Sequence, residues 1–152
     1  MQGVHVEFIG AEWERKDDLT WLLYEVLYRD FGVSIEHDWR QEMPGSLIAV
    51  ALAGDGALLG AARLLPAPGD ARRQVRQLAV LPGAQSQGVG RALMEALEAR
   101  AAEEGATEIW LHARDTAFAF YERLGYEFTS EIFVSELTGI PHRTMRKALA
   151  QN

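Results

Sequence analysis

The start of the chain carries one alternating and one helical pattern of apolar residues. Val4 to Ile9 alternates apolar and polar side chains, as a strand with one buried face does. From about Arg15 to Phe31 the apolar residues recur every three or four positions, which is the spacing of an amphipathic helix, and Gly32 can end it. A second, shorter helix is expected around Ile35 to Glu42.

Two apolar runs and a glycine-containing turn lie further along the chain. Ser46 to Ala53 and Ala57 to Leu65 flank the sequence Gly54-Asp55-Gly56. Glycine and aspartate between two such runs are the strongest short-range signal for a β-hairpin. Arg72 to Leu81 then predicts a longer strand, which ends at Pro82-Gly83. These patterns predict three strands, of which the first two are antiparallel.

The clearest helix of the chain is predicted between Gly88 and Glu104. Its apolar residues form one stripe, most of its glutamates lie off that stripe, and Gly105 can close it. The remaining patterns predict, in chain order, a strand from Thr107 to His112, a helix capped by Asp115 or Thr116 that ends at Leu124 before Gly125, and strands over Tyr126 to Val134 and Ile140 to Lys147.

The order of these elements predicts an α/β (α+β) fold, in which helices pack on the faces of a mixed sheet. A length of 152 residues lies in the usual range of one compact domain, and no repeat or linker divides the chain. We therefore expect a single domain over residues 1–152.

Composition and charge exclude several classes of chemistry. The absence of cysteine excludes disulfides, thiolate zinc sites and a cysteine nucleophile. The four histidines are scattered without ligand-like spacing, so we expect no requirement for a metal ion. The net charge of -7 disfavours binding to nucleic acid, which depends on many lysine and arginine contacts, and it suits a cationic substrate such as an amine.

Neither a membrane span nor a secretory leader is predicted. No stretch approaches the roughly 20 consecutive apolar residues that a transmembrane helix needs. The amino terminus also lacks a basic stretch that leads into an apolar core. We therefore expect a cytoplasmic protein that does not bind membranes.

The most informative segment is a glycine loop between a strand and a helix. Gln77 to Val80 is followed by a turn from Pro82 to Gln87 and by a helix that opens at Gly88-Val89-Gly90. Glycines at such a junction let a ligand approach the backbone, and the free N–H groups and positive dipole end of the helix attract anions. The glycines alone are equally compatible with a tight turn that binds no ligand.

Two other phosphate-binding loops fit this segment less well. A Rossmann loop needs a third glycine at the position of Leu93. A Walker loop needs Lys and then Ser or Thr at the positions of Val89 and Gly90. Both loops are therefore disfavoured.

The glycine loop and its flanks resemble the acetyl-CoA motif of the GNAT acyltransferase superfamily. A second segment, Ala117 to Tyr126, is similar to the family's Ala-x-x-Phe-Tyr-x-x-x-Gly-(Phe or Tyr) helix. The likeness covers roughly Leu58 to Lys147, whereas about the first fifty residues, which shape the acceptor pocket in this family, show no specific likeness. The residues that carry the first motif are Leu78-Ala79-Val80-Leu81-Pro82 and Gln85-x-x-Gly88-x-Gly90-Arg91.

The resemblance implies a GNAT fold with a mixed, mostly antiparallel sheet, and an enzyme that moves the acetyl group of acetyl-CoA to a primary amine of a small molecule or a protein. In that family the strand before the loop pairs with the pantetheine arm, and the loop amides hold the pyrophosphate. Ser86 stands where many members have a further glycine, and serine is small enough for the loop to form. The late strands of such folds can pair, so a homodimer is also expected. The residues implied for acetyl-CoA binding are Leu78, Ala79, Val80, Gln85, Ser86, Gln87, Gly88, Val89, Gly90 and Arg91.

The resemblance also implies a catalytic role for Tyr121. A phenol stays protonated at neutral pH, so Tyr121 can donate a hydrogen bond to the departing sulfur, and an aromatic packing role is the alternative. A main-chain N–H near Leu78 to Val80 is implied for the thioester carbonyl.

The base that accepts the amine proton is not obvious. Gln74 stands where some members have a glutamate, which leaves His112 and His142 as candidates. Because no clear base is found, a non-catalytic acyl-CoA sensor of the same fold is the alternative function.

Overall fold

The structure of the chain is a computed structural model that describes residues 3–10, 12–32, 45–136 and 138–150. Helix α1 (Lys16–Leu23) continues into a π-helical turn, η1 (Tyr24–Tyr28), and a 3-10 turn, η2 (Arg29–Phe31). Gly32 ends this helix in the left-handed conformation, with φ 76°. The helix expected around Ile35 to Glu42 lies outside the described residues.

The described strands form one open sheet with eight members, most of them antiparallel. The strands follow the order β1-β2-β3-β4-β5-β8-β6, and β7 also pairs with β8. Strands β4 and β5 are the parallel neighbours in this order. This arrangement confirms the predicted fold class. The strands are β1 (His5–Ile9), β2 (Leu47–Leu52), β3 (Leu58–Leu64), β4 (Arg72–Val80), β5 (Glu108–Arg114), β6 (Glu127–Phe128), β7 (Phe133–Val134) and β8 (Pro141–Ala148).

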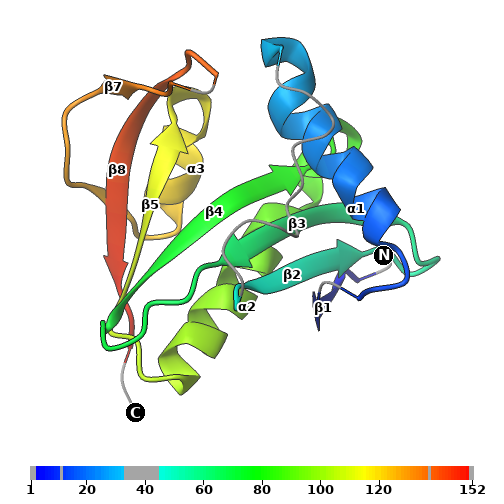
Figure 1. Cartoon of the computed structure of the whole chain (residues 1–152), viewed down its shortest axis with the longest axis horizontal. Helices are drawn as coiled ribbons and strands as arrows, with labels where there is room; N and C mark the ends of the chain where they lie inside the picture. The colour runs from blue at the N-terminus through cyan, green and yellow to red at the C-terminus, as the bar shows by residue number, and fades with distance from the viewer. Residues whose placement is uncertain (1–2, 11, 33–44, 137, 151–152) are drawn as a thin grey trace.

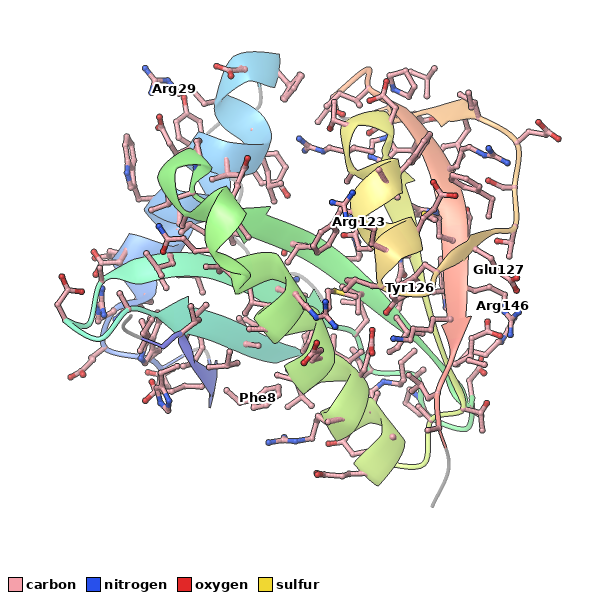
Figure 2. The ribbon with its side chains drawn as sticks, turned by 180° about the vertical axis from the view of Figure 1, so that it is seen from behind. Phe8, Arg29, Arg123, Tyr126, Glu127 and Arg146 are labelled. Atoms are coloured by element: carbon pink, nitrogen blue, oxygen red, sulfur yellow. The ribbon has the colours of Figure 1, made fainter. Side chains whose placement is uncertain are left out.

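Helices cover both faces of the sheet, with α1 on one face and α2 (Val89–Glu103) and α3 (Phe118–Arg123) on the other (Figures 1 and 2). The apolar stripe of α2 is buried, with Leu93 and Leu97 fully inaccessible, and it packs mainly on β2, β3 and β4. The apolar face of α1 forms a second buried cluster with small residues of the sheet, among them Ala61 and Ala79. Each helix thus buries the face that its periodicity predicts.

Three details of the second half of the chain differ from the sequence prediction. Tyr126 to Val134 forms two short strands, β6 and β7, because the segment between them bends away while each strand pairs with a different part of β8. Neither Asp115 nor Thr116 caps a helix by a side-chain hydrogen bond, since a 3-10 turn, η4 (Asp115–Ala117), precedes α3. Strand β5 continues two residues beyond His112, to Arg114.

Among the helices of the described residues, none has the length and apolar character that crossing a membrane requires.

Candidate active site

The two parallel strands in the middle of the sheet separate toward their carboxyl ends. Strands β4 and β5 pair over Arg72 to Gln74 and Glu108 to Trp110, and beyond these positions they diverge, as Figure 1 shows. A cavity of about 560 Å³ opens at the divergence. Its walls include β4 from Gln74 to Leu78, the end of β5, and parts of η1, α3, β7 and β8.

Strand β4 contains a β-bulge at the wall of this cavity. Ala61 of β3 pairs with Ala79 of β4, and Arg63 pairs with Arg76, so two steps on β3 match three steps on β4. Gln77 supplies the extra residue and has φ 57°, an uncommon value for a residue other than glycine. Such backbone strain is concentrated at functional sites because the surrounding structure must hold it.

A hydrogen bond to η1 fixes the bulge. The Gln77 Nε2 atom donates to the Tyr28 hydroxyl at 2.8 Å. The Gln77 Oε1 atom is buried and has no hydrogen-bond partner among the described residues. Tyr28 and Gln77 both line the cavity, so this contact ties the π-helical turn to the cavity wall.

The main chain at the end of β4 directs donors into the gap between the strands. The Leu81 N–H donates to the Leu59 carbonyl of β3 at 2.9 Å. Since successive N–H groups of a strand point to opposite sides, those of Val80 and Leu78 point away from β3, toward the gap. The Gln85 Nε2 atom donates to the Val80 carbonyl at 3.2 Å, which ties the glycine loop to this strand.

The glycine loop leads directly into α2. Residues Pro82–Gln87, which include Ser86, form a 3-10 turn, η3, and Gly88 adopts the left-handed conformation with φ 77° before α2 begins at Val89. The first turn of a helix has N–H groups without helical partners and a partial positive charge. Gln85, Gln87 and Gly88 are exposed here, so these groups are accessible to a ligand.

Three of the sequence-predicted residues in this loop have distinct packing roles. Val89 is fully buried under the sheet, so only its main chain can contact a ligand. Gly90 packs against α3, because a Cβ atom built on it would lie 3.0 Å from the Phe120 ring. Arg91 is exposed, and its Nε atom pairs with Glu95 at 2.7 Å.

Tyr121 is buried and lines the cavity from the side of α3. Its ring contacts Phe120 and Tyr126, with centroids 5.0 and 5.7 Å apart. Burial raises the pKa of Tyr121 well above its ordinary value, and the nearby Arg114 opposes this by a smaller amount. The phenol therefore stays protonated at any ordinary pH and can act as a hydrogen-bond donor.

The two candidate histidines lie on the neighbouring strands β5 and β8. The His112 Nδ1 atom is 3.0 Å from the Thr144 hydroxyl oxygen, and the ring edge meets Phe133. The His142 ring stacks on Phe133, and its Nδ1 donates to the Ile140 carbonyl at 2.8 Å, which leaves Nε2 as the acceptor in the neutral form. Both rings line the cavity.

The pKa of His112 is lowered from its ordinary value. The largest cause is burial, followed by the charges of His142 and Arg76. A lowered pKa keeps the imidazole neutral near pH 7, which is the form that accepts a proton. Gln74 also lines the cavity, but its amide cannot titrate.

Several residues of the cavity wall were missed by sequence reasoning. Tyr28 and Arg114 reach the cavity through η1 and the last residue of β5, and Glu136 does so from the turn after β7. Arg76 also lines the cavity, because its alternation with the buried Val75 places it on the opposite face of β4. In the described part of the chain no group of three histidine, aspartate or glutamate side chains is arranged to hold a metal ion.

The cavity between the diverging strands β4 and β5 thus lies near the glycine loop that opens α2. The family model of the GNAT acetyltransferase domain matches residues 22–149. The chain therefore belongs to the GNAT acetyltransferase family.

Individual relatives agree with this assignment. Streptothricin acetyltransferase of Streptomyces lavendulae is 31% identical over 109 residues, which are 70% of this chain and 58% of that protein. An acyl-CoA N-acyltransferase from Pseudomonas aeruginosa is 25% identical with a TM-score of 0.75, over 96% of this chain and 100% of that chain. An aminoglycoside 6'-N-acetyltransferase complexed with coenzyme A shares the fold, with a TM-score of 0.80 and 19% identity over 97% and 98% of the two chains.

The chain spans about half the length of the first curated relatives that it matches, which are from Bacillus subtilis.

Proposed function

We propose that this protein is an acetyl-CoA-dependent N-acetyltransferase that acts on a primary amine. The observation that supports the proposal is that three features lie close together in the structure. These are the gap beyond the paired part of β4 and β5, the glycine loop at the start of α2, and the buried Tyr121 on the cavity wall. The pyrophosphate of acetyl-CoA would lie at the loop amides, and the pantetheine arm would extend along Leu78 to Val80.

The proposed reaction forms one C–N bond and breaks one C–S bond. The amine nitrogen attacks the thioester carbonyl, whose oxygen accepts a hydrogen bond from a main-chain N–H at the end of β4. His112 accepts the proton that the amine loses. CoA leaves as a thiolate, which the Tyr121 hydroxyl stabilises by a hydrogen bond until the thiolate takes a proton from water.

A non-catalytic acyl-CoA sensor is the second candidate function. The presence of Gln74, where some family members have a glutamate base, favours it. Release of free thiol from acetyl-CoA in the presence of a panel of amines and peptides distinguishes the two functions, because a sensor binds acetyl-CoA without consuming it.

Acetyl-CoA is expected to raise the melting temperature of the protein. At a concentration 100 times its Kd the ligand contributes about 2.7 kcal/mol, which shifts the midpoint by roughly 5–10 °C for a domain of this size. Arg91→Glu is expected to weaken the affinity measured by calorimetry about 10-fold or more, because it places a negative charge beside the proposed pyrophosphate site. Unchanged affinity in this variant would contradict the proposed location.

The matched control for Arg91→Glu is Arg123→Glu, an exposed arginine on α3 outside the loop (Figure 2). This control should keep wild-type affinity. Gly90→Glu is a poorer test of the same idea. Its side chain would press on Phe120 and move α3 with Tyr121, so lost binding would not report on charge alone.

The rate is expected to depend on pH through His112. Below the pKa of His112, which burial lowers from its ordinary value, both the amine and the imidazole must lose a proton before reaction. The logarithm of kcat/KM should therefore rise with a slope of about two at acidic pH and about one above that pKa. His112→Gln should keep a slope of about one throughout, while His5→Gln should follow the wild type. If the slope of about two at acidic pH is lost in His142→Gln but kept in His112→Gln, His142 is the base.

A further inference from the structure

The described walls of the cavity carry more basic than acidic groups. Arg76 comes from β4, His112 and Arg114 come from β5, and His142 comes from β8. Glu136 is the only carboxylate among the described residues that line the cavity. The chain as a whole has a net charge of -7, so the described part of the cavity wall has the opposite sign of charge to the protein.

Strand alternation places these basic groups on one face of the sheet. Leu111 and Ala113 of β5 are buried in the core cluster with α2, so His112 and Arg114 face the other way. Arg114 pairs in register with His142 of β8, which therefore lies on the same face. Arg76 is close enough for its charge to act on His112.

The two arginines lack the carboxylate partners that neighbouring arginines have. On the same strand, Arg72 pairs with Asp70 and Arg73 pairs with Glu104. Within the described ranges, neither Arg76 nor Arg114 forms an ion pair with a carboxylate. Arg114 donates one hydrogen bond to the Leu27 carbonyl at 2.9 Å, which leaves further N–H groups of its guanidinium for a ligand.

The phosphates of the cofactor do not account for these charges. No residue of the glycine loop from Gln85 to Arg91 lines the cavity, and the thioester end of acetyl-CoA is uncharged. The anion that the cavity attracts must therefore come from the other substrate. A guanidinium holds a carboxylate or phosphate through two parallel hydrogen bonds, and Arg76 is exposed enough to be reached by a ligand.

We propose that the acceptor amine carries an anionic group, a carboxylate or a phosphate ester, which Arg76 and Arg114 bind inside the cavity. This proposal rests on the proposed acetyltransferase function. It makes the cavity selective against diamines and polyamines, because their second cation would face two arginines.

The test compares acceptors that differ in the anionic group alone. The pairs are β-alanine with β-alaninamide, phenylalanine with phenylalaninamide, and phosphoethanolamine with ethanolamine. We expect kcat/KM to be at least 10-fold higher for the anionic member of one or more pairs, and the pair concerned identifies carboxylate or phosphate as the group. The amines of the amides are less basic than those of the acids, so a larger fraction of them is unprotonated and able to react. If the cavity did not recognise the anionic group, the amides would have the higher kcat/KM, which is the opposite of the expected result. Equal or higher kcat/KM for the neutral members of every pair that reacts overturns it.

Variants locate the preference on the cavity wall. Arg76→Gln should reduce the preference for the anionic acceptor about 10-fold or more, and Arg114→Gln should do the same, with acetyl-CoA affinity unchanged in both. Arg72→Gln, an exposed arginine on the same strand that does not line the cavity, is the matched control and should keep the wild-type preference. A preference that survives in both Arg76→Gln and Arg114→Gln overturns the assignment.

Binding decides the question if no pair is turned over. The CoA-saturated protein is then titrated by calorimetry with the N-acetylated anionic acceptors and their neutral counterparts. Tighter binding of the anionic forms, lost in Arg76→Gln, supports the proposal, and equal or absent binding overturns it. Binding of acetyl-CoA by the same sample tests the proposed function separately. A failure of the anionic-acceptor proposal can therefore be distinguished from a failure of the proposed function.

Discussion

Replacement of Tyr121 by phenylalanine is expected to lower kcat about 10- to 100-fold. This loss corresponds to roughly 1.4 to 2.7 kcal/mol, the range of one hydrogen bond to a charged group in the transition state. The ring of Tyr121 packs between Phe120 and Tyr126, and phenylalanine keeps both contacts. The melting temperature and the acetyl-CoA affinity should therefore stay close to wild type, while turnover is measured where chemistry limits the rate.

Tyr126→Phe is the matched control for this experiment. The Tyr126 hydroxyl donates to Glu98 of α2 at 2.8 Å, near the carboxyl end of α3 (Figure 2), and Tyr126 is not among the residues that line the cavity. Its removal should cost about 0.5–1.5 kcal/mol of stability with little change in kcat. The two variants thus separate chemistry from folding. Unchanged turnover in Tyr121→Phe would make Tyr121 a packing residue, and weaker cofactor affinity with normal turnover would make it a binding residue only.

Much of the fold could be predicted from local patterns. The stripe of α2 follows from spacing, because its apolar residues turn to one buried face. The hairpin of β2 and β3 follows from two apolar runs around a glycine-containing turn, and its residues are buried on both faces of the sheet. Gly125, with φ 98°, ends α3 as its sequence position predicts. The two short motifs also predicted the family. Both motifs lie where the chain changes direction, and the backbone conformation there restricts the residue types that fit.

The geometry of the site depends on tertiary contacts that spacing does not encode. The bulge at Gln77 arises from the pairing of β3 with β4 and from a contact with Tyr28, which is 49 residues away in the chain. The strand predicted over Tyr126 to Val134 was interrupted for a similar reason. Tyr126 to Thr129 alternate apolar and polar residues, but the alternation is lost from Ser130 onward, and the two ends pair with separate positions of β8.

The charge of the cavity is a further property that overall composition conceals. The net charge of the chain suits a cationic ligand, yet the arginines of β4 and β5 gather on the wall that an acceptor would contact. Arg76 and Arg114 are far apart in the sequence and line the same cavity because β4 and β5 begin as parallel neighbours and then diverge around it. Alternation along each strand identifies the face of each residue, whereas the register between the strands requires the structure.

Gly60 is a second residue whose importance appears in the structure alone. It lies within β3, where glycine weakens a strand, and its register partner is Val80 of β4. A Cβ atom built on Gly60 would lie 2.8 Å from the Ala79 carbonyl oxygen, 3.1 Å from Val89 and 3.2 Å from Leu93. The absent side chain therefore lets α2 approach the sheet where β4 leads into the glycine loop.

Gly60→Ala is expected to destabilise the protein by about 1–3 kcal/mol, because a backbone oxygen cannot move aside as a flexible side chain does. The melting temperature should fall by roughly 2–10 °C for a domain of this size. Acetyl-CoA affinity should fall as well, since relief of the contact moves the main chain of Ala79 beside the proposed pantetheine site. Gly10→Ala, where an added Cβ meets nothing within 4 Å, is the control and should change stability by no more than about 0.5 kcal/mol. A Gly60→Ala protein as stable as the wild type, with the same acetyl-CoA affinity, would show that α2 and β4 can separate without cost.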